Sequence, residues 1–109
     1  MPPPPLSVLL DECIDWRYGR ELEPHRVSTV SEQGWTGLKN GELLRKASGE
    51  FDVFITVDRN LSFQQNLPDY SLAVLVLTGP SNRLQDLVPH VPRILKALEC
   101  PQPGTAVLI

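Results

Sequence analysis

The sequence has few of the residues that mark several common classes of site and scaffold. It contains only two cysteines, Cys13 and Cys100, and two histidines. No second cysteine or histidine falls at zinc-ligand spacing from either cysteine, so a thiolate metal site is not expected. Counting cannot exclude a disulfide between the two, but in a reducing compartment we expect two buried free thiols.

Long apolar runs and an excess of basic charge are also missing. The longest apolar run extends only from Leu72 to Leu77, whereas a helix needs about 20 apolar residues to cross a bilayer, so no membrane span is expected. Met1 and the prolines after it have neither the basic region nor the apolar stretch of a secretory signal, which favours a cytoplasmic location. The net charge of -3 excludes a generally basic nucleic-acid-binding surface, so a local patch must carry any RNA contact. The cations available for such a patch are Arg17, Arg20, Lys39, Arg45, Lys46 and Arg59.

The remaining composition is that of one α/β domain. A length of 109 residues allows one hydrophobic core, and the prolines among residues 1–5 predict a flexible amino terminus ahead of a single domain at 6–109. Apolar, β-branched segments predict strands at 6–10, 25–30, 52–57, 72–77 and 105–109. The second of these alternates polar and apolar residues, which favours an edge position.

Helical patterns fill the gaps between the predicted strands. Asp15 can cap a helix to Leu22 whose inward face is Trp16, Gly19 and Leu22. Asn40 is a suitable N-cap for a second helix, which a left-handed Gly49 would end. A third apolar stripe runs from residue 84 to 98 and should break where Pro92 opens a new helix.

Strands that alternate with helices predict a three-layer open sheet, mostly parallel, of four to five strands. Ligands of such sheets bind beyond the carboxyl ends of the strands. Asp11 and Asp58 each follow an apolar strand, so we expect them to meet there if the first and third strands are neighbours. Glu42 lies in the first turn of the helix that leads into the third strand.

Three clustered carboxylates repel one another unless a cation joins them, and Mg²⁺ or Mn²⁺ prefers such oxygen ligands. The predicted site therefore holds a divalent metal on Asp11, Glu42 and Asp58, suited to phosphodiester hydrolysis. Lys39, Arg59 and Asn60 are the expected substrate-binding residues, and either Lys39 or Arg59 can meet the phosphate. Taken singly, each acid also has a plain structural explanation as a cap, a helix-dipole partner or an Asx turn.

The same residues resemble a known family, the short PIN-like proteins regarded as toxins of toxin–antitoxin pairs. The resemblance rests on Leu9-Leu10-Asp11-Glu12-Cys13, on the segment from Gly34 to Leu44, and on Ile55-Thr56-Val57-Asp58-Arg59-Asn60-Leu61. It implies a parallel α/β fold, Mg²⁺ or Mn²⁺ bound by Asp11, Glu42 and Asp58, and cleavage of RNA. Many relatives carry a further acid where this chain has Asn60, which offers a neutral oxygen. The resemblance also admits a protein antitoxin and a homodimer as partners.

Two other readings remain open. A response-regulator receiver likewise places acids after the first strand and an aspartate after the third, and Thr78 would suit it. However, only residues 59–71 separate the third and fourth strands, and no lysine follows the last strand. The other alternative is an interaction module without catalysis, for which Asn60 is the main argument.

Overall fold

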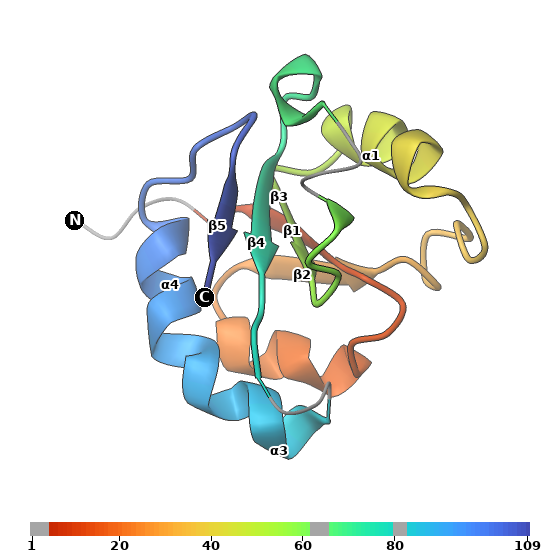
Figure 1. Ribbon diagram of the computed structural model, residues 1–109. Helices are drawn as coiled ribbons and strands as arrows, with labels where there is room; N and C mark the ends of the chain where they lie inside the picture. Colours follow the sequence, from red (N-terminus) through yellow and green to blue (C-terminus); the bar gives the residue numbers. More distant parts are fainter. Residues whose placement is uncertain (1–4, 62–65, 80–82) are drawn as a thin grey trace.

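The computed structural model describes residues 5–61, 66–79 and 83–109. Five parallel strands form one sheet in the order β2-β1-β3-β4-β5, which confirms the predicted parallel α/β architecture (Figure 1). Their bounds are Ser7–Leu10 for β1, Arg26–Thr29 for β2, Val53–Thr56 for β3, Ala73–Val76 for β4 and Ala106–Leu108 for β5. The predicted flexibility of residues 1–5 falls almost wholly outside the described residues, because only Pro5 is among them.

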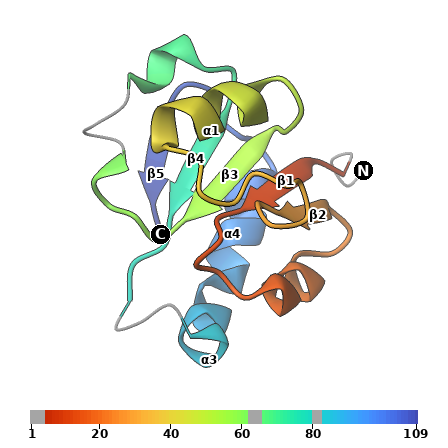
Figure 2. The same cartoon turned by 90° about the vertical axis from the view of Figure 1, so that its right-hand side faces the viewer.

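Helices cover both faces of the sheet and make three layers (Figures 1 and 2). One face carries the 3₁₀ helix η1, Trp16–Leu22, together with α3, Leu84–Leu87, and α4, Val91–Leu98. The other face carries α1, Asn40–Ser48, and the short 3₁₀ helix η2, Leu67–Asp69. A further 3₁₀ turn, η3, Val88–His90, joins α3 to α4, so the apolar stripe breaks just before Pro92 as predicted.

Alternation along the central strands divides the core between the two faces. Val53 and Ile55 pack into the cluster under η1 and α4, while Phe54 between them packs into the cluster under α1. All residues of β3 and β4 are buried, because helices cover these strands on both sides. The predicted edge position of the second strand is confirmed, since β2 pairs only with β1 among the described strands.

The segment after β1 forms the predicted helix, but its inward face differs from the prediction. Asp15 caps η1 by accepting a hydrogen bond from the Arg17 N–H. The buried residues are Tyr18 and Leu22, whereas Trp16 is 58% exposed. The inward placement of Trp16 was wrong because Tyr18 takes the buried position, where its hydroxyl donates to the Leu87 carbonyl at 2.7 Å.

Two details of α1 also differ from the prediction. Lys39, not Asn40, is the N-cap, and it makes no side-chain capping bond. Gly49 ends the helix with φ of -86°, so the predicted left-handed residue was wrong and the chain leaves the helix in a right-handed conformation. The side chain of Asn40 is used elsewhere, at the candidate site.

Both cysteines are exposed and no disulfide joins them, so the predicted burial of the thiols was wrong. Across the described ranges, no helix has the length and apolar character that crossing a membrane requires.

Candidate functional site at the carboxyl ends of β1 and β3

Asp11 and Asp58 lie at the same edge of the sheet, beyond neighbouring strands. β1 and β3 pair in parallel with Leu10 opposite Ile55, as the predicted site requires. The pairing continues past the end of β1, because the Asp11 N–H donates to the Ile55 carbonyl at 2.9 Å. The backbone at Asp11 is therefore fixed relative to β3.

A buried hydroxyl links the two aspartates. Thr56, the last residue of β3, is fully buried, and its Oγ1 donates to Asp11 Oδ2 at 2.7 Å. The same oxygen accepts the Asp58 N–H at 3.1 Å. One side chain thus orients the Asp11 carboxylate and holds the backbone that carries Asp58. Sequence reasoning passed over Thr56, although a single hydroxyl at the end of an otherwise apolar strand, two residues before an acid, was a usable signal.

Asp58 has its own network of hydrogen bonds. Its Oδ1 accepts the Asn60 N–H at 2.9 Å, which is the Asx turn considered for this aspartate. Its Oδ2 accepts Asn40 Nδ2 at 3.4 Å, a contact that ties the first residue of α1 to the end of β3. Asn60 supports the carboxylate through its backbone, and its side chain is exposed.

Glu42 and the two proposed phosphate-binding cations surround this pair less tightly. Glu42 is exposed in the first turn of α1, and no hydrogen bond or ion pair joins it to Asp11 or Asp58. Lys39 and Arg59 are exposed and adjoin Asn40 and Asp58 in the chain. Within residues 5–61, 66–79 and 83–109, no three or more acidic, histidine or cysteine side chains are grouped to hold a metal ion. The three-carboxylate metal site stays a prediction.

The donor chemistry of the aspartate pair fits a hard divalent cation. Mg²⁺ is commonly bound through one or two carboxylates, with water and substrate phosphate completing its coordination. Asp11 and Asp58 supply two such carboxylates, and hydrogen bonds from Thr56 and Asn40 orient them as the outer partners of metal ligands do. Glu42 is the nearest acid along α1 to the Asn40 anchor.

The thiol of Cys13, two residues after Asp11, is affected by its surroundings. Although the Cys13 side chain reaches the surface, the protein atoms around its thiol displace part of its water, and this desolvation, followed by the negative charge of Asp11, raises the pKa of Cys13 above its usual value of 9.0. The thiolate is therefore disfavoured at neutral pH, and Cys13 is a poor candidate for a nucleophile.

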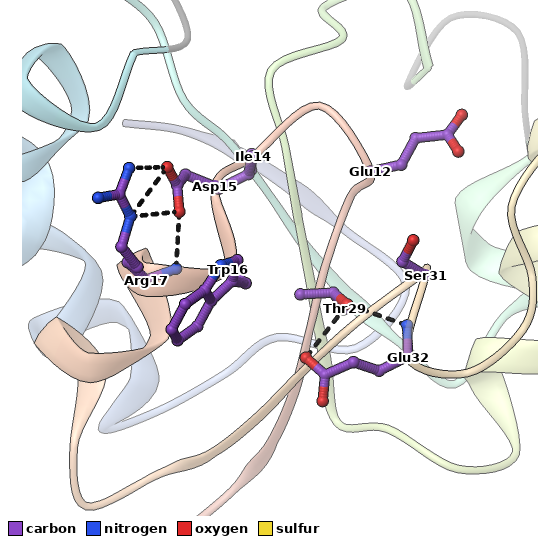
Figure 3. A pocket seen from close by; sticks show the side chains of 8 residues that line it. All are labelled: Glu12, Ile14, Asp15, Trp16, Arg17, Thr29, Ser31 and Glu32. Atoms are coloured by element: carbon purple, nitrogen blue, oxygen red, sulfur yellow. Dashed lines mark hydrogen bonds and ion pairs between the residues drawn. The ribbon is translucent and has the colours of Figure 1, made fainter.

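A hollow of about 800 Å³ opens on the other side of β1, between the carboxyl ends of β1 and β2 and the start of η1 (Figure 3). It is lined by Glu12, Ile14, Asp15, Trp16, Arg17, Thr29, Ser31 and Glu32. Sequence reasoning missed this hollow because it placed Trp16 in the core.

Comparisons with protein-family models, with curated proteins and with solved structures found no match to the chain.

Proposed function

We propose that the protein is a metal-dependent nuclease of PIN-like type that hydrolyses RNA phosphodiester bonds, with Asp11 and Asp58 holding Mg²⁺ or Mn²⁺. The observation that carries the proposal is the Thr56 hydroxyl, which connects both aspartates at the sheet edge where open α/β folds bind ligands. The hydroxyl uses its proton for the carboxylate of one acid and an oxygen lone pair for the backbone N–H of the other, so the two residues are held in a fixed relation.

The residues divide the work of the proposed reaction among them. A bound divalent ion would supply Lewis-acid polarisation of a phosphoryl oxygen and an acidified water. Thr56 and Asn40 hold the two aspartates in orientation, and Glu42 lies on the helix that Asn40 anchors, where it can orient the attacking water. Lys39 and Arg59 are the cations placed to meet the phosphate. A toxin role, with a protein antitoxin or a homodimer, follows from the resemblance alone.

One observation favours the receiver alternative, and another opposes it. The strand order β2-β1-β3-β4-β5 is the order of flavodoxin-like folds, to which receivers belong. However, the Thr78 hydroxyl donates to the Ile109 carbonyl at 2.6 Å, so it is committed to joining β4 to β5 and does not point freely at the acids. We therefore keep the nuclease as the proposal.

The idle interaction module is the second candidate. It is favoured by the absence of a three-ligand group in the described part of the chain. It is also favoured by Asn60, which is neutral where many PIN-like proteins carry an acid. Titration with Mn²⁺ during thermal unfolding separates the two candidates. A nuclease site should raise the unfolding temperature with increasing metal concentration, because binding to the folded state alone stabilises it. No shift at millimolar Mn²⁺ would favour the module.

Replacement of Asp58 tests the reaction itself. Asp58→Asn keeps an oxygen that can accept the Asn60 N–H but removes the charge, so we expect the fold to persist and metal-dependent cleavage of RNA to be lost. The measurement is cleavage of a labelled RNA with Mn²⁺ and with a chelator. Asp69→Asn, at an exposed acid beside Asn66, is the matched control and should cleave as the wild type does. Undiminished cleavage by Asp58→Asn would remove Asp58 from the mechanism.

A further inference from the structure

The hollow beside β1 and β2 carries more negative than positive charge. Its lining holds the carboxylates of Glu12, Asp15 and Glu32 and one guanidinium, that of Arg17. Arg17 is already paired: its Nε lies 3.0 and 3.2 Å from the two Asp15 oxygens, and its Nη2 lies 2.6 Å from Oδ2. Neither Glu12 nor Glu32 forms an ion pair within the described ranges. The unpaired carboxylate that points into the hollow is that of Glu32 (Figure 3), and its negative charge favours a cationic ligand over a phosphate backbone.

Trp16 supplies an aromatic wall to this hollow. It is the largest exposed apolar side chain among the described residues, at 58% exposure, although it belongs to a helix that otherwise packs on the core. Its ring already accepts a cation, because the guanidinium carbon of Arg20 lies 4.8 Å from the ring centroid. Trp16 lines the hollow and Arg20 does not, so part of the Trp16 side chain borders the hollow away from this contact. Aromatic faces bind guanidinium groups well.

Glu32 is the carboxylate best placed to act with Trp16. Glu32 Oε1 accepts a hydrogen bond from the hydroxyl of the buried Thr29 at 3.2 Å. The Glu32 backbone N–H in turn donates to Thr29 Oγ1 at 3.1 Å. Figure 3 shows the Glu32 side chain extending across the hollow toward the side on which Trp16 lies, while Glu12 points away. The reciprocal bonds with Thr29 fix the carboxylate and leave its second oxygen available.

We propose that this hollow binds an arginine side chain presented by a basic segment of a partner protein. A guanidinium is planar, so it can stack on Trp16 while its edge donates to the available oxygen of Glu32, whereas a lysine ammonium has no plane with which to stack. Both kinds of contact already occur among the described residues, in the Arg20–Trp16 stack and in the Arg17–Asp15 pair. The inference stands whether or not Asp11 and Asp58 hold a metal.

Calorimetric titration with two blocked peptides tests the proposal. One peptide carries two arginines separated by glycine, and the other carries lysines at the same positions. We expect the arginine peptide to bind more tightly. Glu32→Gln should weaken its binding about tenfold, since a hydrogen bond between charged groups is lost. Trp16→Leu should weaken it about threefold through the lost stacking.

A control of equal charge change separates the site from general attraction to an acidic protein. Glu50→Gln removes one exposed carboxylate in the turn before β3, near the opposite end of the sheet, and should leave the affinity unchanged. The proposal is overturned if the two peptides bind equally, or if Glu50→Gln weakens binding as much as Glu32→Gln. It is also overturned if guanosine monophosphate displaces the arginine peptide from the wild type, because the hollow would then be a nucleotide site. Circular dichroism of each variant verifies the fold.

Discussion

The Thr56 hydroxyl is a buried polar group whose bonds are all spent on the candidate site. Replacing it by valine keeps the shape of the side chain but leaves Asp11 Oδ2 and the Asp58 N–H without this partner. We expect Thr56→Val to lower the free energy of unfolding by about 1–3 kcal/mol, because two hydrogen bonds that each contribute about 0.5–1.5 kcal/mol are lost. Chemical denaturation measures this loss.

The same variant distinguishes a structural hydroxyl from one that positions the site. If Thr56 orients Asp11 for a metal, the Mn²⁺-induced rise in unfolding temperature should shrink in Thr56→Val and be retained in Thr56→Ser, which keeps the hydroxyl. Equal metal responses in the two variants would limit Thr56 to stabilising the fold.

At the scale of single residues, the sequence predicted the acids of the candidate site better than the side chains that orient them. Asp11 and Asp58 could be found because each follows an apolar strand, and the ends of parallel strands share an edge. The roles of Thr56 and Asn40 depend on side-chain directions at the junction of three elements, which periodicity does not encode. Trp16 was misplaced because its spacing of six residues from Leu22 fits the helical pattern equally well whether the side chain is buried or exposed.

At the scale of elements, Tyr18 joins η1 to the helix pair on the same face of the sheet. Its buried hydroxyl donates to the Leu87 carbonyl at the end of α3. Tyr18→Phe removes this bond and should cost about 0.5–1.5 kcal/mol of stability at neutral pH. The matched control is Tyr70→Phe, since the Tyr70 hydroxyl makes no hydrogen bond to the described residues.

The Tyr18 variant should also change how stability depends on pH. Burial, together with the charge of Glu21, raises the pKa of Tyr18 above its usual value of 10.0. The folded state therefore holds the phenol proton more tightly than the unfolded state, so the stabilisation is complete below pH 10 and is lost as the pH rises further. Urea denaturation between pH 9 and about 11 should show a steeper loss for the wild type than for Tyr18→Phe. Parallel curves would contradict this.

Elements were predicted well where composition and chain breakers agree. The strands at 52–57 and 72–77 are uniformly apolar, and the stripe at 84–98 contains prolines that force a break, so both features were recovered. The ends of α1 were not, because a cap is decided by competition among bonds. Asn40 bonds to Asp58 in place of its own helix, and this partner lies 18 residues away in the chain.

At the scale of the whole molecule, the two hydrophobic clusters cannot form independently. Alternate residues of the same strand supply them, as Val53 and Ile55 do for one face and Phe54 for the other. Losing the helices on one face would expose one side of β3 while the other side remained packed. The sheet therefore couples the two layers of helices, and the described residues should unfold as one unit.

The two tryptophans allow this coupling to be measured, since each reports one face. Trp35 packs edge-on against Phe51 beside the α1 cluster, and Trp16 lies on η1 over the opposite face. We expect Trp16→Phe, in which Trp35 reports alone, to show the same denaturation midpoint by fluorescence as by far-ultraviolet circular dichroism. Trp35→Phe, in which Trp16 reports alone, should behave likewise, because two-state unfolding gives coincident transitions for every probe. Comparing each variant with its own dichroism removes any change in stability that the substitution causes. A fluorescence midpoint well below the dichroism midpoint in either variant would mean that one helical layer detaches first.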